Sequence, residues 1–190
     1  MTTNIMIVGV GGQGTLLASR ILGNVAIKEG YDVKVSEVHG MSQRGGSVVT
    51  YVKYGEEVNS PIIDQGEADL ILAFEKLEAI RALPYLKKDG KMILNDGEIA
   101  PMPVITGAKQ YPEGILEELN QKINATAVPA LALSLEAGSP KAVNVVLIGV
   151  LAKRMTIAKE VFIDVIKQTV PAKFLELNLK AFELGYNYGE

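Results

Sequence analysis

The sequence predicts an α/β fold: a three-layer α/β/α sandwich around a Rossmann-like, mostly parallel sheet, with helices at the C-terminal end of the chain. Short apolar runs that suit buried strands, such as 5–8 and 68–74, alternate with helical patterns. A glycine-rich turn joins the first of these runs to a helix. From Ser139 onward the pattern is helical, which adds the C-terminal helices to the sheet.

The length of the chain indicates one domain. It has 190 residues, of which 48% are hydrophobic. This length gives one domain a full core and is short for two. No internal repeat, low-complexity tract or long linker interrupts the pattern. We therefore expect residues 1–190 to form a single domain.

The first half of the chain contains the best strand signals. A helical pattern over 76–86 carries Pro84, which should break or kink that helix near Leu83. The segment 59–66 contains a proline and a glycine and is expected to be a loop. Strands are predicted at 5–8, 31–38, 47–54, 68–74 and 91–95.

The second half is predicted to be mainly helical. The short apolar piece 104–106 lies between prolines and a glycine and favours a brief edge strand, whereas 129–135 fits either a strand or a helix. Ser139 is a good N-cap and precedes a proline at the first helical position. The other predicted elements are a helix at 113–123, a strand at 125–128 and helices at 159–168 and 172–185.

The glycine turn has the spacing G-x-G-x-x-G, with Gly9, Gly11 and Gly14 between a strand and a helix. Glycines let a ligand or another backbone come close, and the helix behind them directs unpaired N–H groups at that point. Dinucleotide binding would also need an acidic residue at the end of the second strand, which Glu37 fits loosely. The alternative is a tight strand-to-helix turn that binds no dinucleotide. The side-chain amide of Gln13 is available to a ligand or partner in either case.

The loop from Glu37 to Gly46 gathers polar residues directly after a strand. We expect it to lie beside the glycine turn, because loops at the carboxyl ends of strands form the ligand crevice of an open α/β sheet. Arg44 is suited to hold a carboxylate or phosphate, and His39 to act as an acid–base group. The alternatives are that Arg44 pairs with Glu37 or another chain, and that His39 only ends a strand.

Asn144 is a polar residue within the apolar helix that follows Ser139. A single asparagine in such a place usually bonds a backbone group or faces a neighbouring loop. A position at an interface with another chain is the alternative.

The composition excludes several kinds of chemistry. The chain has no cysteine and a single histidine, so it cannot supply a thiol nucleophile or hold a Cys-ligated iron–sulfur cluster or a structural zinc of the usual kinds. No Ser–His–Asp pattern, carboxylate pair or metal-ligand spacing stands out. We predict no catalytic residue and no metal site in this chain, so any redox metal must belong to another chain.

Charge and hydropathy exclude two classes of partner. The net charge is −3 and no basic stripe occurs, which argues against nucleic acid. The longest apolar run, 143–152, is about half the ~20 residues of a membrane span, and the N-terminus lacks the charge pattern of a signal peptide. We expect a cytoplasmic protein.

Two motifs are the most specific in the chain: GGQG at 11–14 and HGMSQRGG at 39–46. They lie in four segments, in order GVGGQGTLLASRILGNVA, SEVHGMSQRGGSVVTYVKYG, ADLILAFEKLEAIRALPYLKKDG and VNVVLIGVLA. Together these segments resemble the gamma domain of the 2-oxoacid:ferredoxin oxidoreductases, with the small subunit of the indolepyruvate type as the most similar version. The resemblance covers nearly the whole chain.

The resemblance implies an enzyme that decarboxylates a 2-oxoacid oxidatively, forms an acyl-CoA and passes electrons to ferredoxin. Thiamine diphosphate and iron–sulfur clusters would belong to a large catalytic subunit, and this chain would be a gamma-type subunit that is inactive alone. The glycine turn would then face either the partner chain or coenzyme A at the shared interface, rather than hold a dinucleotide. The residues expected to contact the cofactor or partner are Gly9, Gly11, Gly12, Gln13, Gly14, Ser42, Gln43 and Arg44.

Two other functions fit the same residues. One is a stand-alone oxidoreductase that binds a dinucleotide with the Gly9–Gly14 turn and Glu37. The other is a binding module without an enzymatic partner. The sequence leaves the oxoacid open between the indolepyruvate and pyruvate types.

Overall fold

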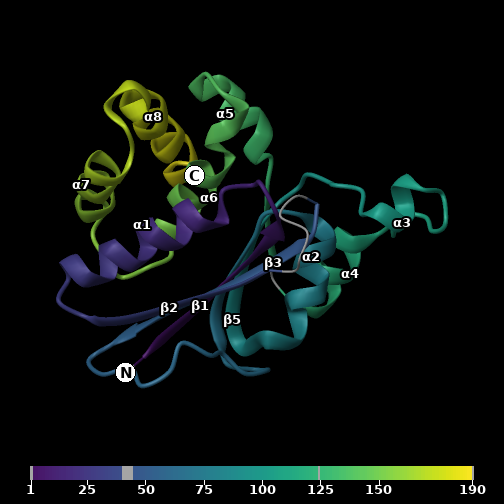
Figure 1. Cartoon of the computed structure of the whole chain (residues 1–190), viewed down its shortest axis with the longest axis horizontal. Helices are drawn as coiled ribbons and strands as arrows, with labels where there is room; N and C mark the ends of the chain where they lie inside the picture. Colours follow the sequence, from purple (N-terminus) through teal and green to yellow (C-terminus); the bar gives the residue numbers. More distant parts are fainter. Residues whose placement is uncertain (1, 40–44, 124, 190) are drawn as a thin grey trace.

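A computed structural model describes residues 2–39, 45–123 and 125–189. Within them, six strands form a sheet in the order β2-β3-β1-β4-β5-β6 (Figure 1). The strands are β1 (Thr3–Val10), β2 (Asp32–His39), β3 (Ser47–Gly55), β4 (Ala68–Ala73), β5 (Leu86–Asn95) and β6 (Ala125–Val128).

The directions of the strands are mixed. β1, β4, β5 and β6 run parallel to one another, while β3 is antiparallel to both β1 and β2. Five of the six strands therefore point the same way, which confirms the mostly parallel sheet. Because the hairpin of β2 and β3 folds back at one side, an antiparallel strand lies next to β1.

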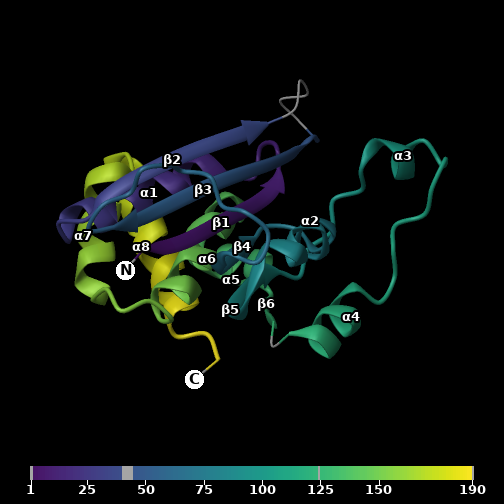
Figure 2. The same ribbon diagram turned by 90° about the horizontal axis from the view of Figure 1, so that it is seen from below.

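Helices cover both faces of the sheet, which confirms the three-layer sandwich (Figures 1 and 2). One layer contains α1, α6, α7 and α8, and the other contains α2 and α4. The helices are α1 (Thr15–Lys28), α2 (Lys76–Ala82), α3 (Met102–Ile105), α4 (Ile115–Lys122), α5 (Ala130–Ala137), α6 (Val143–Ala152), α7 (Lys159–Thr169) and α8 (Leu175–Tyr186), with 3₁₀ turns at Leu83–Tyr85, Pro140–Ala142 and Ala172–Phe174.

Alternate residues of β1 fill the two cores. Ile5 and Ile7 point into the core beneath α1, α6 and α8, whereas Met6 and Val8 point into the core beneath α2 and α4. The tightest helix contact is between α6 and α8, where a Cβ on Gly185 would lie 1.9 Å from the carbonyl oxygen of Val146. Only a residue without a side chain fits there.

Two sequence predictions need correction or completion. The predicted edge strand at 104–106 is wrong, because α3 covers most of it as a single helical turn. Its first residue follows Pro101, whose carbonyl accepts hydrogen bonds from Val104 N (2.8 Å) and Ile105 N (3.0 Å). Proline at positions 101 and 103 fixes backbone angles that suit a first helical turn. The ambiguous segment after Pro129 forms α5.

Residues 99–111, here called the arm, connect β5 to α4 and include α3. Both views show the arm projecting away from the body of the molecule (Figures 1 and 2). The projection leaves the side chains of Met102 and Ile105 64% and 66% exposed.

Candidate functional site

The four parallel strands β1, β4, β5 and β6 end at one edge of the sheet, which is where ligands bind in open α/β folds. The glycine turn follows β1, Glu75 follows β4 and a short polar loop follows β5. We call this the carboxyl edge.

The glycines of the turn have different roles. A Cβ on Gly9 would lie 2.9 Å from Gln13 Oε1 and 3.0 Å from Phe74 Cβ, and a Cβ on Gly14 would lie 2.6 Å from Asn144 Nδ2. These two glycines serve close packing inside the chain. Gly12 and Gly14 both have a left-handed φ, of +101° and +84°, but a Cβ on Gly12 would have no neighbour within 4 Å. Its backbone therefore faces open space.

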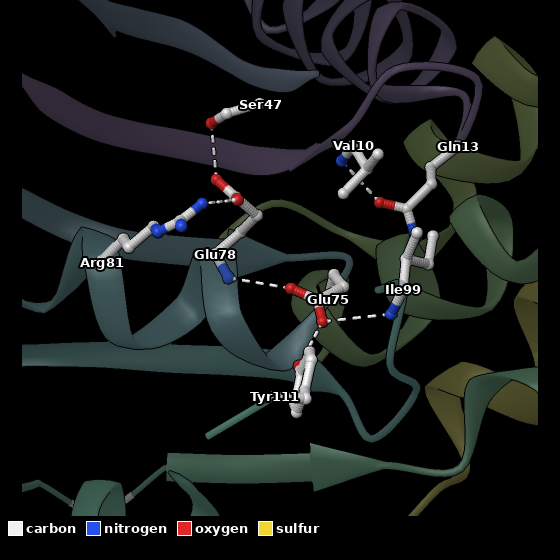
Figure 3. Close-up of polar contacts among 8 residues, drawn as sticks. All are labelled: Val10, Gln13, Ser47, Glu75, Glu78, Arg81, Ile99 and Tyr111. Atoms are coloured by element: carbon white, nitrogen blue, oxygen red, sulfur yellow. Dashed lines mark hydrogen bonds and ion pairs between the residues drawn. The ribbon is translucent and has the colours of Figure 1, made fainter. Parts of the chain in front are cut away.

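Gln13 ties two strands together. Its Oε1 accepts a hydrogen bond from Val10 N (2.7 Å; Figure 3), and its Nε2 donates to Phe74 O (2.9 Å). The amide that we expected to serve a ligand or partner thus fixes the ends of β1 and β4. Asn144 is similarly used: it is buried, and its Nδ2 lies 3.4 Å from Gly14 O. The prediction that Asn144 bonds a backbone group is confirmed.

The sheet order argues against a dinucleotide site that uses Glu37. Dinucleotide-binding folds place the acidic residue on the parallel strand next to β1. Here β3 occupies that place, and Glu37 lies on β2 opposite Thr50 of β3. With neighbouring strands about 4.8 Å apart, β2 is roughly 10 Å from β1. Glu37 is therefore displaced by one strand from the position that a ribose contact needs.

The loop between β2 and β3 meets the glycine turn, as expected. Gly11 N donates to Gly46 O at 2.9 Å, so the end of this loop lies directly beside the turn. Ser42, Gln43 and Arg44 lie outside the described residues, and so does the side chain of His39. Their predicted roles stay predictions.

A half-open pocket of about 480 Å³ lies beside the glycine turn. Asn95, at the end of β5, is 6% exposed, and its Nδ2 donates to Phe74 O at 3.2 Å. Its Oδ1 is buried and has no hydrogen-bond partner among the residues that the structure describes. Such an acceptor favours a ligand that donates an N–H or O–H group. The lining residues are Gly12, Gln13, Gly14, Asn95, Gly97, Glu98, Ile99, Leu131, Pro140, Lys141 and Val143.

Sequence reasoning missed two buried carboxylates at this edge. Glu75 is 1% exposed and caps α2, accepting a hydrogen bond from Glu78 N at 2.9 Å. Its other oxygen accepts from Ile99 N (3.2 Å) and from the hydroxyl of Tyr111 (Figure 3). Burial and this carboxylate raise the pKa of Tyr111 well above its ordinary value. The signal available in the sequence was an acidic residue directly after a buried strand.

Glu78, the second buried carboxylate, joins α2 to β3. It accepts hydrogen bonds from Ser47 Oγ (2.5 Å) and Arg81 Nη1 (2.6 Å; Figure 3). Both oxygens are thus hydrogen-bonded within the chain, one of them to a guanidinium group. The described part of the chain contains no group of three or more His, Cys, Asp or Glu residues that would hold a metal ion. None of its helices is long and apolar enough to cross a membrane.

The comparisons with known proteins decide the family. A model of the family described as pyruvate ferredoxin/flavodoxin oxidoreductase matches residues 4–188. The chain belongs to this family. As a member, it is a subunit of a 2-oxoacid:ferredoxin oxidoreductase, which confirms the family and function predicted from the sequence.

Two relatives that both come from Thermococcus kodakarensis differ in their sequence identity to this chain. Its indolepyruvate oxidoreductase subunit IorB is 44% identical over 190 residues, which cover 96% of this chain and 93% of the relative. Its common gamma subunit of pyruvate/ketoisovalerate oxidoreductases is 27% identical over 183 residues, covering 94% and 92%.

A solved structure confirms the fold. The gamma subunit of a keto/oxoacid ferredoxin oxidoreductase from Geobacter sulfurreducens superposes with a TM-score of 0.72. It is 24% identical and covers 97% of this chain and 96% of that chain. The α/β architecture of this member of the pyruvate ferredoxin/flavodoxin oxidoreductase family is therefore that of a known gamma subunit.

Proposed function

We propose that this chain is the small subunit of an indolepyruvate-type oxidoreductase. The reaction converts a 2-oxoacid anion and coenzyme A into an acyl-CoA, carbon dioxide and a proton, while two electrons pass to ferredoxin. The observation that carries the proposal is the contrast between 44% identity to an indolepyruvate subunit and 27% to a pyruvate/ketoisovalerate subunit of one organism. A cytoplasmic location is part of this proposal.

The chemistry is assigned to a larger partner subunit that holds thiamine diphosphate and the iron–sulfur clusters. Cysteine thiolates are the usual ligands of such clusters, and this chain has no cysteine. Its two buried carboxylates are both engaged in internal hydrogen bonds. We infer that this chain shapes one side of the active site and leaves bond making and breaking to the partner.

We further propose that the pocket beside the glycine turn receives part of coenzyme A. Asn95 Oδ1 offers an acceptor to an amide N–H of the pantetheine arm, and Lys141 and the start of α1 favour a phosphate. Apolar lining from Ile99, Leu131 and Val143 suits the aliphatic part of that arm. Bound coenzyme A would supply the thiol that accepts the acyl group. Ser42, Gln43 and Arg44 remain predicted contacts of the same ligand or of the partner.

Co-purification of this chain with its native partners tests the proposal. The complex is scored for thiamine diphosphate, iron and coenzyme A-dependent dye reduction with indolepyruvate, pyruvate and 2-oxoisovalerate. We expect a large cluster-bearing partner and a preference for indolepyruvate. A complex that prefers pyruvate would correct the substrate class only. A chain that emerges alone with a bound dinucleotide and its own turnover would contradict the proposed function.

A further inference from the structure

The base of the arm is fastened at both ends to one carboxylate. Ile99 N at its start and the Tyr111 hydroxyl at its end both bond to Glu75 Oε1, which is buried and held by the start of α2 (Figure 3). Hydrogen bonds to a buried, charged group are among the stronger ones in proteins. The base of the arm is therefore tied to the body, although the arm contains no strand or long helix.

A groove of about 350 Å³ lies between the arm and the body. Met102 and Ile105 line its arm side, and Leu77 and Arg81 of α2 line its other side. The Arg81 side chain is 54% exposed and donates to Glu78 Oε1 through Nη1. The groove thus combines an apolar wall with a half-exposed guanidinium group.

We propose that the arm and this groove are a docking surface for the larger catalytic subunit, a proposal that rests on the proposed function. The segment it fits presents an apolar side chain between Met102 and Leu77 and a carboxylate to Arg81. Exposed apolar side chains on a projecting segment are costly in water and gain free energy when a partner covers them.

Two observations favour the larger subunit over a second copy of this chain. Gly45 and Gly46 also line the groove, and Ile99 lines both the groove and the pocket beside the glycine turn. The arm is thus continuous with the edge where the shared active site is proposed. Because a standard interface buries ~800 Å² per partner, we assign the arm and the groove to one part of a larger interface that includes the carboxyl edge.

The test measures binding of the small subunit to the purified large subunit by competition against labelled wild-type chain. The arm variant carries both Met102→Asp and Ile105→Asp. The control variant carries both Ile27→Asp and Ile62→Asp, at two comparably exposed isoleucines outside the arm and the groove. We expect the arm variant to bind at least tenfold more weakly and the control to stay within threefold of wild type. Both should keep the wild-type melting temperature, because the replaced side chains are exposed.

Each outcome decides between the proposals. If the arm variant binds the large subunit as tightly as the wild-type chain does, the docking proposal is overturned and the proposed function stands. Wild-type chain that binds no large subunit overturns both. If the wild-type chain self-associates and the arm variant does not, the surface binds a second copy of this chain. That result would also overturn the docking proposal.

Discussion

Packing is tightest where α6 contacts α8, and it is most open at the carboxyl edge and the arm. Between α6 and α8 the backbones touch, because Gly149 and Gly185 leave no room for a side chain. At the carboxyl edge, Gly12 faces open space, Asn95 keeps an unpaired oxygen and Met102 is largely exposed. The first region is closed by contacts between its own helices, whereas the second has groups for which the described residues supply no partner.

The largest expected effect is on the packed side. Gly185→Ala places a methyl group 1.9 Å from Val146 O, and backbone on both helices must move to relieve the clash. We expect a loss of about 3 kcal/mol or more in the free energy of unfolding, measured by urea denaturation.

Gly23→Ala is the matched control for that substitution. Gly23 is also a buried glycine in a helix, but the nearest atom to its added Cβ would be 3.6 Å away. Alanine there should be neutral or stabilise by up to about 1 kcal/mol, because glycine is a poor helix former. Equal losses at positions 185 and 23 would contradict the distinction drawn between these packing sites.

The next effect concerns the fastening of the arm. Glu75→Ala removes the acceptor for Glu78 N, Ile99 N and the Tyr111 hydroxyl. We expect a loss of about 2–4 kcal/mol in the free energy of unfolding and faster amide exchange at Ile99. Unchanged exchange at Ile99 would mean that Glu75 does not hold the arm.

On the open side, Asn95→Ala should weaken coenzyme A rather than the oxoacid. Loss of one buried hydrogen bond corresponds to about a tenfold rise in KM for coenzyme A in the assembled enzyme. The KM for the 2-oxoacid should stay within twofold. An equal rise in both KM values would indicate a general loss of structure and would contradict the coenzyme A pocket.

Tyr111→Phe gives the smallest effect at neutral pH, about 1–2 kcal/mol, and changes the pH dependence. The pKa of Tyr111 is raised on folding, so the folded state holds its proton more tightly. This contribution is fully present below pH ~10, the pKa of an unfolded tyrosine, and is lost as the pH rises above it. The stability of the wild type should fall more steeply above pH ~10 than that of the variant. Parallel curves would contradict the raised pKa.

The packed parts of the fold were predictable from sequence for a clear reason. Strand β4 is apolar except for Asp69, which makes it a clear signal in the sequence. The N-cap of Ser139 is a local signal that the structure confirms, with Lys141 N donating to its hydroxyl at 3.3 Å. The direction of β3 could also have been predicted, because residues 40–46 are too few for the crossover that a parallel pair of strands needs. What the sequence does not reveal is that β3 lies between β2 and β1 in the sheet. The strand at 104–106 was predicted wrongly because these residues lie on the arm, where Ile105 is exposed and the segment pairs with no described strand.

The site was predicted in outline and missed in detail. The glycine turn and the neighbouring loop were placed together correctly, as Gly11 and Gly46 show. The engagement of Gln13 with β1 and β4, and the hydrogen bonds of Glu75 to a residue 36 positions away, depend on long-range contacts. Such contacts leave no periodic pattern in the sequence, so only the structure reveals them.

The most direct test of the account is an add-back titration of this chain to the isolated large subunit, read as indolepyruvate oxidation dependent on coenzyme A. The account predicts little turnover from either chain alone and a rise to a plateau at a fixed ratio of the two chains. The arm variant should need at least tenfold more chain to reach half of that plateau. Full activity of the large subunit without this chain would contradict the account.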